Sequence, residues 1–126
     1  MAHRSRLCAI LIDTDNDRFD ATVGFWSAAL GRTVKATRSP RYRALPPRRP
    51  ADLAVYLQRV EPGESGVHFD IETDDVDAEV SRLEALGARR KRKVKSWYVM
   101  EDPGGHAFCV VPVQSTAWPD GAIEWQ

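Results

Sequence analysis

The sequence predicts an α+β fold built from two successive βαβββ modules. The first observation is an internal repeat, in which "IDTDN" at residues 12–16 matches "IETDD" at residues 71–75. The second is that "AALG", ending at Gly31, matches "EALG", ending at Gly87. Each half therefore contains a strand, an acidic helix start and a glycine stop.

Length and composition are those of one domain of 126 residues, with 18 basic and 18 acidic side chains and a formal net charge of zero. Such a chain has no long-range attraction to nucleic acid or anionic membranes, and we expect a soluble, cytoplasmic protein. Two cysteines are too few for a disulfide framework, so both are expected to be reduced. The expected parts are module one at about 5–60, module two at about 66–113 and an irregular tail at 114–126.

The first module begins with an apolar strand that leads into a helix capped by Asp17 or Asp20 and ended by Gly31. The inner face of the strand is expected to carry Leu7, Ala9 and Leu11. The buried side of the helix is expected to carry Val23, Trp26 and Leu30. Three extended segments separated by proline-rich breakers follow at 32–37, 42–45 and 52–60.

The second module opens with "GVHFDIETDD" at residues 66–75, which alternates with period two. His68, Asp70 and Glu72 therefore share one face of a strand. Asp74 or Asp75 caps the helix that follows, and Gly87 is expected to be left-handed after it. The apolar stripe of this helix is Val76, Val80, Leu83 and Leu86. Three extended segments follow at 88–94, 96–101 and 106–113.

Three stretches, "LAVYLQRVEP", "VHFDIETDDVDAEVSRLEALGA" and "WYVMEDPGGHAFCVV", resemble the glyoxalase-like domains of the vicinal oxygen chelate superfamily. That superfamily also includes glyoxalase I, extradiol dioxygenases and bleomycin-resistance proteins. The resemblance implies curved mixed sheets that enclose a cavity, with the helices outside. In metal-using relatives, the ligands lie on the first and last strands of each module and point inward.

The resemblance places Ala9, Gln58, His68 and Cys109 at those four ligand positions. Alanine has no donor atom, glutamine offers only a neutral amide, and no glutamate remains for a hard divalent ion. A divalent metal is therefore not favoured. Zinc bound by His68, Gln58 and Cys109 is the lesser alternative, because thiolate and imidazole are suitable zinc ligands.

Without a metal, His68 and Asp70 are the candidate catalytic pair, in which the carboxylate orients the ring and the imidazole transfers a proton. The alternative is that the pair only satisfies its own hydrogen bonds inside a polar cavity. The expected ligand contacts are Tyr56, Gln58, His68, Trp97 and Cys109. These residues combine apolar surface with a few polar groups, as small-molecule sites do.

Two function classes remain open. One is an enzyme of the lyase, isomerase or dioxygenase type that uses His68, and the other is a non-catalytic protein that sequesters a small molecule, as bleomycin-resistance proteins do. The basic stretches at 38–50 and 89–95 contain few aromatic residues, so a charged sheet edge is a better interpretation than nucleic-acid binding. We expect a homodimer, and Trp118 and Trp125 indicate that the tail packs on the domain.

Overall fold

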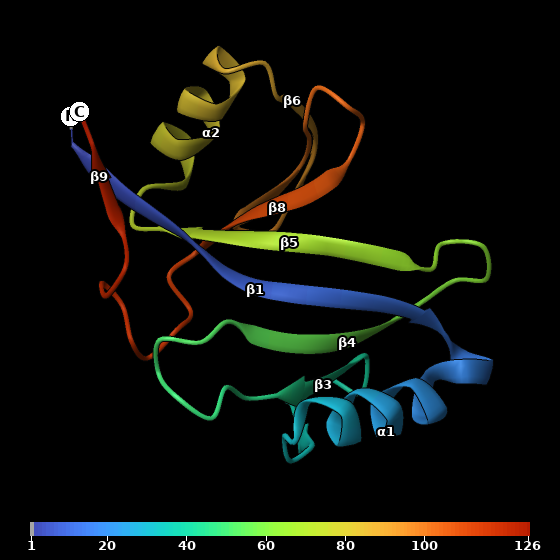
Figure 1. The fold of residues 1–126 in the computed structure, drawn as a ribbon. Helices are drawn as coiled ribbons and strands as arrows, with labels where there is room; N and C mark the ends of the chain where they lie inside the picture. The colour runs from blue at the N-terminus through green and yellow to red at the C-terminus, as the bar shows by residue number, and fades with distance from the viewer. Residues whose placement is uncertain (1) are drawn as a thin grey trace. The chain divides into compact units, whose positions relative to one another are not determined.

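The computed structural model describes residues 2–126, and its elements follow the predicted βαβββ order twice (Figure 1). The first run is β1 (His3–Asp15), α1 (Phe19–Leu30), β2 (Lys35–Ala36), β3 (Tyr42–Leu45) and β4 (Ala54–Val60), with a 3-10 turn η1 (Asn16–Arg18) before α1. The second is β5 (Gly66–Thr73), α2 (Val76–Ala85), β6 (Arg89–Val94), β7 (Trp97–Glu101) and β8 (Ala107–Pro112), followed by β9 (Ile123–Trp125). The predicted α+β class is confirmed.

Contacts divide the chain into two compact units. The central unit is Ala9–His68, and the terminal unit combines the residues up to Cys8 with Phe69–Gln126. The start of β1 thus belongs with the second module, although the repeat places it in the first. Within the described residues, neither α1 nor α2 is long and apolar enough to span a membrane.

In the central unit, β3 lies antiparallel to β4, and β4 lies parallel to β1. Parallel pairing requires a crossover, and α1 supplies it on one face of this sheet (Figure 1). The core between the helix and the sheet consists of Phe19, Val23, Leu45, Val55 and Leu57. Ile12 and Trp26 pack against this cluster. Every second residue of β1 and β4 therefore faces α1, and the residues between them face the opposite side.

The ends of α1 differ from the prediction at one terminus. Gly31 ends the helix in the left-handed conformation with φ of 65°, as expected. Neither Asp17 nor Asp20 is the cap, because the Asp15 carboxylate accepts the Arg18 N–H and caps the preceding 3-10 turn instead. The expectation that Leu30 is buried is also wrong, because this last residue of the helix is 39% exposed.

In the terminal unit, β5 runs parallel to β8, and β8, β7 and β6 continue as antiparallel neighbours. Val80 of α2 packs with Met100 and Val110 in a second apolar cluster. Asp75 is the cap of α2, since its side chain accepts the Ala78 N–H at 3.0 Å. Val76 and Leu83 pack against the cluster as predicted, whereas Leu86 lies beyond the end of the helix and is exposed.

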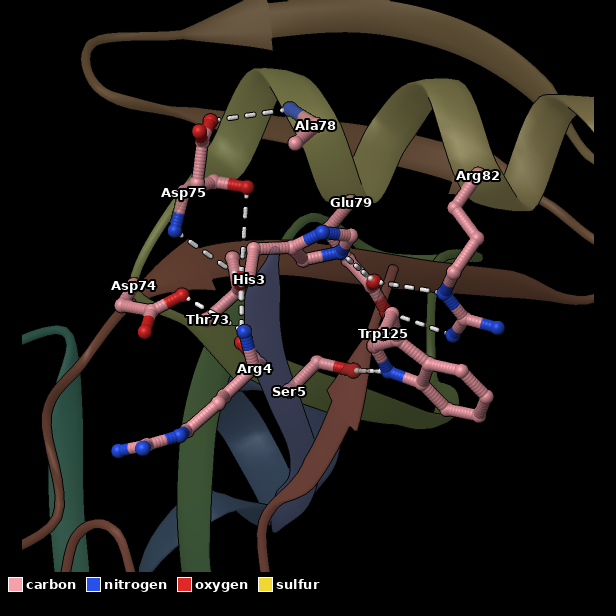
Figure 2. Close-up of polar contacts among 10 residues, drawn as sticks. All are labelled: His3, Arg4, Ser5, Thr73, Asp74, Asp75, Ala78, Glu79, Arg82 and Trp125. Carbon is pink, nitrogen blue, oxygen red and sulfur yellow. Dashed lines mark hydrogen bonds and ion pairs between the residues drawn. The ribbon is translucent and has the colours of Figure 1, made fainter. Parts of the chain in front are cut away.

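The C-terminal tail is not wholly irregular, because β9 pairs antiparallel with the start of β1 and aligns His3 with Trp125. The Trp125 indole donates a hydrogen bond to the Ser5 hydroxyl at 2.9 Å. The Arg82 guanidinium stacks over the indole ring at 3.8 Å, so α2 holds the tail from the other side (Figure 2). These contacts give the expected packing of Trp125 a structural basis.

A buried carboxylate joins the N-terminal strand to α2. Glu79 is fully buried; it receives two hydrogen bonds from Arg82, at 2.8 and 2.9 Å, and lies 2.8 Å from His3 Nε2 (Figure 2). Burial alone would raise the pKa of Glu79, but hydrogen bonds from Arg82, His3 and Ser5 outweigh it and lower the pKa below its ordinary value. The carboxylate is therefore charged at neutral pH.

Candidate functional site

Two side-chain rows cross the face of the central sheet opposite α1. The strand register aligns Asp13 of β1 with Gln58 of β4, and Gln58 with Tyr42 of β3. The next row toward the middle of the sheet is Leu11, Tyr56 and Ala44. Alternation along each strand puts all six on the same face. The face thus combines a largely apolar row with a polar row at its end.

His68 approaches the polar row from β5. Its Nδ1 lies 2.7 Å from the Asp13 carboxylate, and the two side chains are only 15% and 16% exposed. A histidine beside a carboxylate at this distance carries its proton on Nδ1, which makes Nε2 the nitrogen that accepts a further proton. Asp13 therefore fixes the orientation of the His68 ring.

Gln58 connects Asp13 to two further side chains. Its amide nitrogen faces Asp13 Oδ1 at 2.9 Å, because the opposite orientation would bring two oxygens together. Its amide oxygen then accepts hydrogen bonds from Arg41 Nε and the Tyr42 hydroxyl, both at 3.2 Å. A hydrogen-bonded chain thus runs from Arg41 through Gln58 and Asp13 to His68.

The sequence-predicted residues fall into both units. His68, Gln58 and Tyr56 lie in the central unit, where His68 and Gln58 share Asp13 as a partner. The terminal unit contains Asp70, Trp97 and Cys109, of which Asp70 and Cys109 are direct neighbours across β5 and β8. The Gln114 amide nitrogen lies 3.5 Å from the Asp70 carboxylate, and Trp97 begins β7 opposite Val94. The pairing of His68 with Asp70 stays a prediction.

Asp13 is not among the site residues predicted from the sequence, although the sequence contains a signal for it. The inner-face series on the first strand continues from Leu11 to residue 13, where the apolar pattern changes to an acid. An acid that continues an inward-facing apolar series is a candidate for a site residue. Arg41 carries no comparable signal, because it lies in a basic stretch just before β3.

Of the three family ligand positions in the central unit, Ala9, Gln58 and His68, the first two do not suit a metal ion. Ala9 is buried and has no donor atom. The amide oxygen of Gln58 faces the positive guanidinium of Arg41, an environment that disfavours a second cation. His68 is then the one family ligand position of the central unit whose side chain suits a metal, and one imidazole alone is too few ligands for a site.

Cys8 is a buried thiol of the terminal unit. Burial raises its pKa to about 12, and the nearby carboxylates of Glu72 and Asp70 add to this effect. The sulfur lies 3.5 Å from the Asp70 carbonyl oxygen. Cys8 is therefore a neutral packing residue at physiological pH and not a nucleophile.

Comparisons with known proteins agree with this architecture. The family model described as "Glyoxalase-like domain" matches residues 9–111. No curated protein matches the sequence.

Solved structures with a similar fold carry diverse functional names. A glyoxalase/bleomycin resistance protein/dioxygenase superfamily member from Vibrio splendidus 12B01 is 17% identical with a TM-score of 0.56, over 86% of this chain and 99% of its own. An NAD-dependent benzaldehyde dehydrogenase from Legionella pneumophila is 14% identical with a TM-score of 0.64, over 84% and 98%. A methylmalonyl-CoA epimerase from Streptomyces coelicolor, in complex with 2-nitronate-propionyl-CoA, is 23% identical with a TM-score of 0.52, over 87% and 96%. At these identities the likeness concerns the fold alone.

Proposed function

The chain belongs to the glyoxalase-like domain family, and on that premise we propose that it binds a small carbonyl compound and transfers a proton through His68. The observation that carries the proposal is the 2.7 Å contact between His68 Nδ1 and Asp13. A carboxylate at Nδ1 fixes the tautomer and stabilises the imidazolium that forms when Nε2 accepts a proton. The pair therefore suits an isomerase or lyase of the proton-transfer type.

The proposed step is a reversible proton transfer. A carbon–hydrogen bond next to the carbonyl group of the ligand breaks, its electron pair forms an enolate, and the proton moves to His68 Nε2. Returning the proton to the opposite face of the same carbon gives the epimer, re-forms the carbonyl group and regenerates the neutral imidazole. Tyr56 and Leu11 supply apolar contact surface for such a ligand, and Gln58 supplies a polar group at its edge.

The catalytic role expected of Asp70 and the ligand contacts expected of Trp97 and Cys109 remain part of this proposal. A dioxygenase would require a redox metal, and the donor chemistry of Ala9 and Gln58 disfavours that reaction type. Binding without turnover is the second candidate function. It is favoured by the polar row, because Gln58 and Tyr42 can recognise a ligand without any transfer of protons.

Hydrogen–deuterium exchange tests the proposal on small ketones and 2-oxo acids. In D₂O, we expect the wild type to catalyse exchange of the hydrogens next to the carbonyl group, measured by proton NMR. His68→Ala should lower the rate by at least about 100-fold, the usual contribution of a general base, and Asp13→Asn should lower it as well. Metal analysis of both proteins should find no stoichiometric ion.

The matched control is His106→Ala. His106 also pairs with an aspartate, Asp102, at 3.0 Å, but it lies on an exposed turn with 82% of its side chain accessible. Its loss should leave the exchange rate unchanged. Ligand binding without exchange in the wild type would support the sequestering function, and zinc that is lost in His68→Ala would restore the metalloenzyme interpretation.

A further inference from the structure

A cavity of about 430 Å³ lies in the central unit, where β1 and β4 end. Its lining includes two arginines, Arg41 and Arg59, and three acids. The acids are Asp15, Asp17 and Glu61. Because Arg41 also contacts Gln58, this cavity adjoins the polar row that leads to His68.

The two arginines differ in the contacts that their side chains make within the protein. Arg59 stacks on Phe19 at 3.9 Å, and its guanidinium donates to the Pro40 carbonyl at 3.0 Å and to the Asn16 side chain at 2.5 Å. These contacts hold Arg59 in a structural role. Arg41 makes one such contact, from Nε to Gln58, and no carboxylate among the described residues 2–126 forms an ion pair with it.

We propose that Arg41 binds a carboxylate group of the ligand, so that the substrate class is a small carboxylic acid; this inference rests on the function proposed for His68. Because only Nε donates to Gln58, the two terminal nitrogens of the guanidinium remain as a planar fork of donors. A fork of this kind pairs with both oxygens of one carboxylate. The ligand carboxylate would then be connected to His68 through the hydrogen bonds that join Arg41, Gln58 and Asp13.

The acids of the cavity restrict the charge of the ligand. Asp15 is paired with Arg18 at 3.3 Å, whereas Asp17 and Glu61 are exposed at the rim. A phosphate group, which carries close to two negative charges at neutral pH, would meet more repulsion there than a singly charged carboxylate. The cavity therefore favours a monocarboxylate over a phosphate ester.

The test compares 2-oxobutanoate with 2-oxobutanamide, which differ in the carboxylate but share the exchangeable hydrogens. We expect 2-oxobutanoate to bind the wild type at least tenfold more tightly than the amide by titration calorimetry. Arg41→Gln should remove this preference, and Arg48→Gln, which changes another exposed arginine of the same unit, should keep it. Equal affinities in the wild type, a preference that survives in Arg41→Gln, or no binding of either compound would overturn the inference. Tighter binding of hydroxyacetone phosphate, which has a phosphate ester and no carboxylate, would also overturn it.

Exchange measurements separate this inference from the proposed function. If 2-oxobutanoate binds through Arg41 but no variant or wild type catalyses hydrogen exchange, the proton-transfer function fails and the carboxylate site stands. If exchange depends on His68 but proceeds equally for the acid and the amide, the function stands and the role of Arg41 is wrong. A positioning role for Arg41 should raise KM more than it lowers kcat.

Discussion

Glu79 contributes stability that depends on its charge. Because hydrogen bonds lower its pKa in the folded protein, the unfolded chain binds the proton more readily, and this contribution is complete above pH of about 4.5. It is lost as the pH falls through the lower folded-state pKa. We expect Glu79→Gln to destabilise the protein by about 3 kcal/mol at pH 7, because His3 and Arg82 lose a buried charged partner.

Urea unfolding at pH 7 and at pH 3.5 measures both effects. The variant should lose less stability between the two pH values than the wild type does. The control is Glu84→Gln, which removes a partly exposed carboxylate of the same helix that pairs with Arg90 at 2.7 Å and should have a much smaller effect. An identical pH dependence in Glu79→Gln and the wild type would contradict this assignment.

The individual side chains of the site were only partly predictable. His68 and Gln58 followed from the repeat and the family resemblance, because those positions recur at fixed places in the two modules. Asp13 and Arg41 did not, because their roles depend on strand register: Asp13 meets Gln58 only since β1 and β4 pair in parallel with that alignment. Local periodicity does not determine the register between strands that are far apart in the sequence.

Gly87 follows α2 with φ of 112°, a conformation that strains any residue with a Cβ atom. We expect Gly87→Val to destabilise the protein by about 1–3 kcal/mol. Thermal unfolding followed by circular dichroism measures the change. Gly24→Ala is the matched control, because Gly24 lies inside α1 with open space around its Cα and alanine should stabilise that helix slightly. An unchanged melting temperature in Gly87→Val would contradict the prediction.

Helices and strands were predicted more closely than their ends. Glycine stops and proline-rich turns are local signals, so β3 was predicted at its observed bounds and β4 and β6 within a few residues. Leu30 and Leu86 belong to the predicted apolar stripes but lie at the ends of their helices, beyond the core. Periodicity alone does not show where the core ends. β9 has three residues, too few for alternation to be detected.

Several large apolar side chains of the chain lie exposed on its surface. Phe25 and Val67 are each 62% exposed, and Ile123 of β9 is 55% exposed. We therefore expect a homodimer, in which a second copy covers part of this surface. Light scattering at micromolar concentrations should give twice the chain mass of 14.2 kDa. A constant monomer mass across that range would contradict the prediction.

The basic stretch of the second module shows why composition alone is a poor guide to partners. β6 is an edge strand next to β7. Its Arg89 and Lys91 pair with Glu101 of β7 at 2.6 and 3.2 Å. Part of its charge is thus neutralised within the fold. This placement fits a charged sheet edge that resists strand addition by another chain.

The pairing of β9 with β1 brings the first and last described strands together, with His3 opposite Trp125 (Figure 1). A linker of a few residues from Gln126 back to Ala2 would turn these two strands into a continuous hairpin. New termini could then open in the exposed turn at residues 61–65 that joins the modules. The molecule is therefore a natural candidate for circular permutation, in which β5 would begin the chain and β4 would end it.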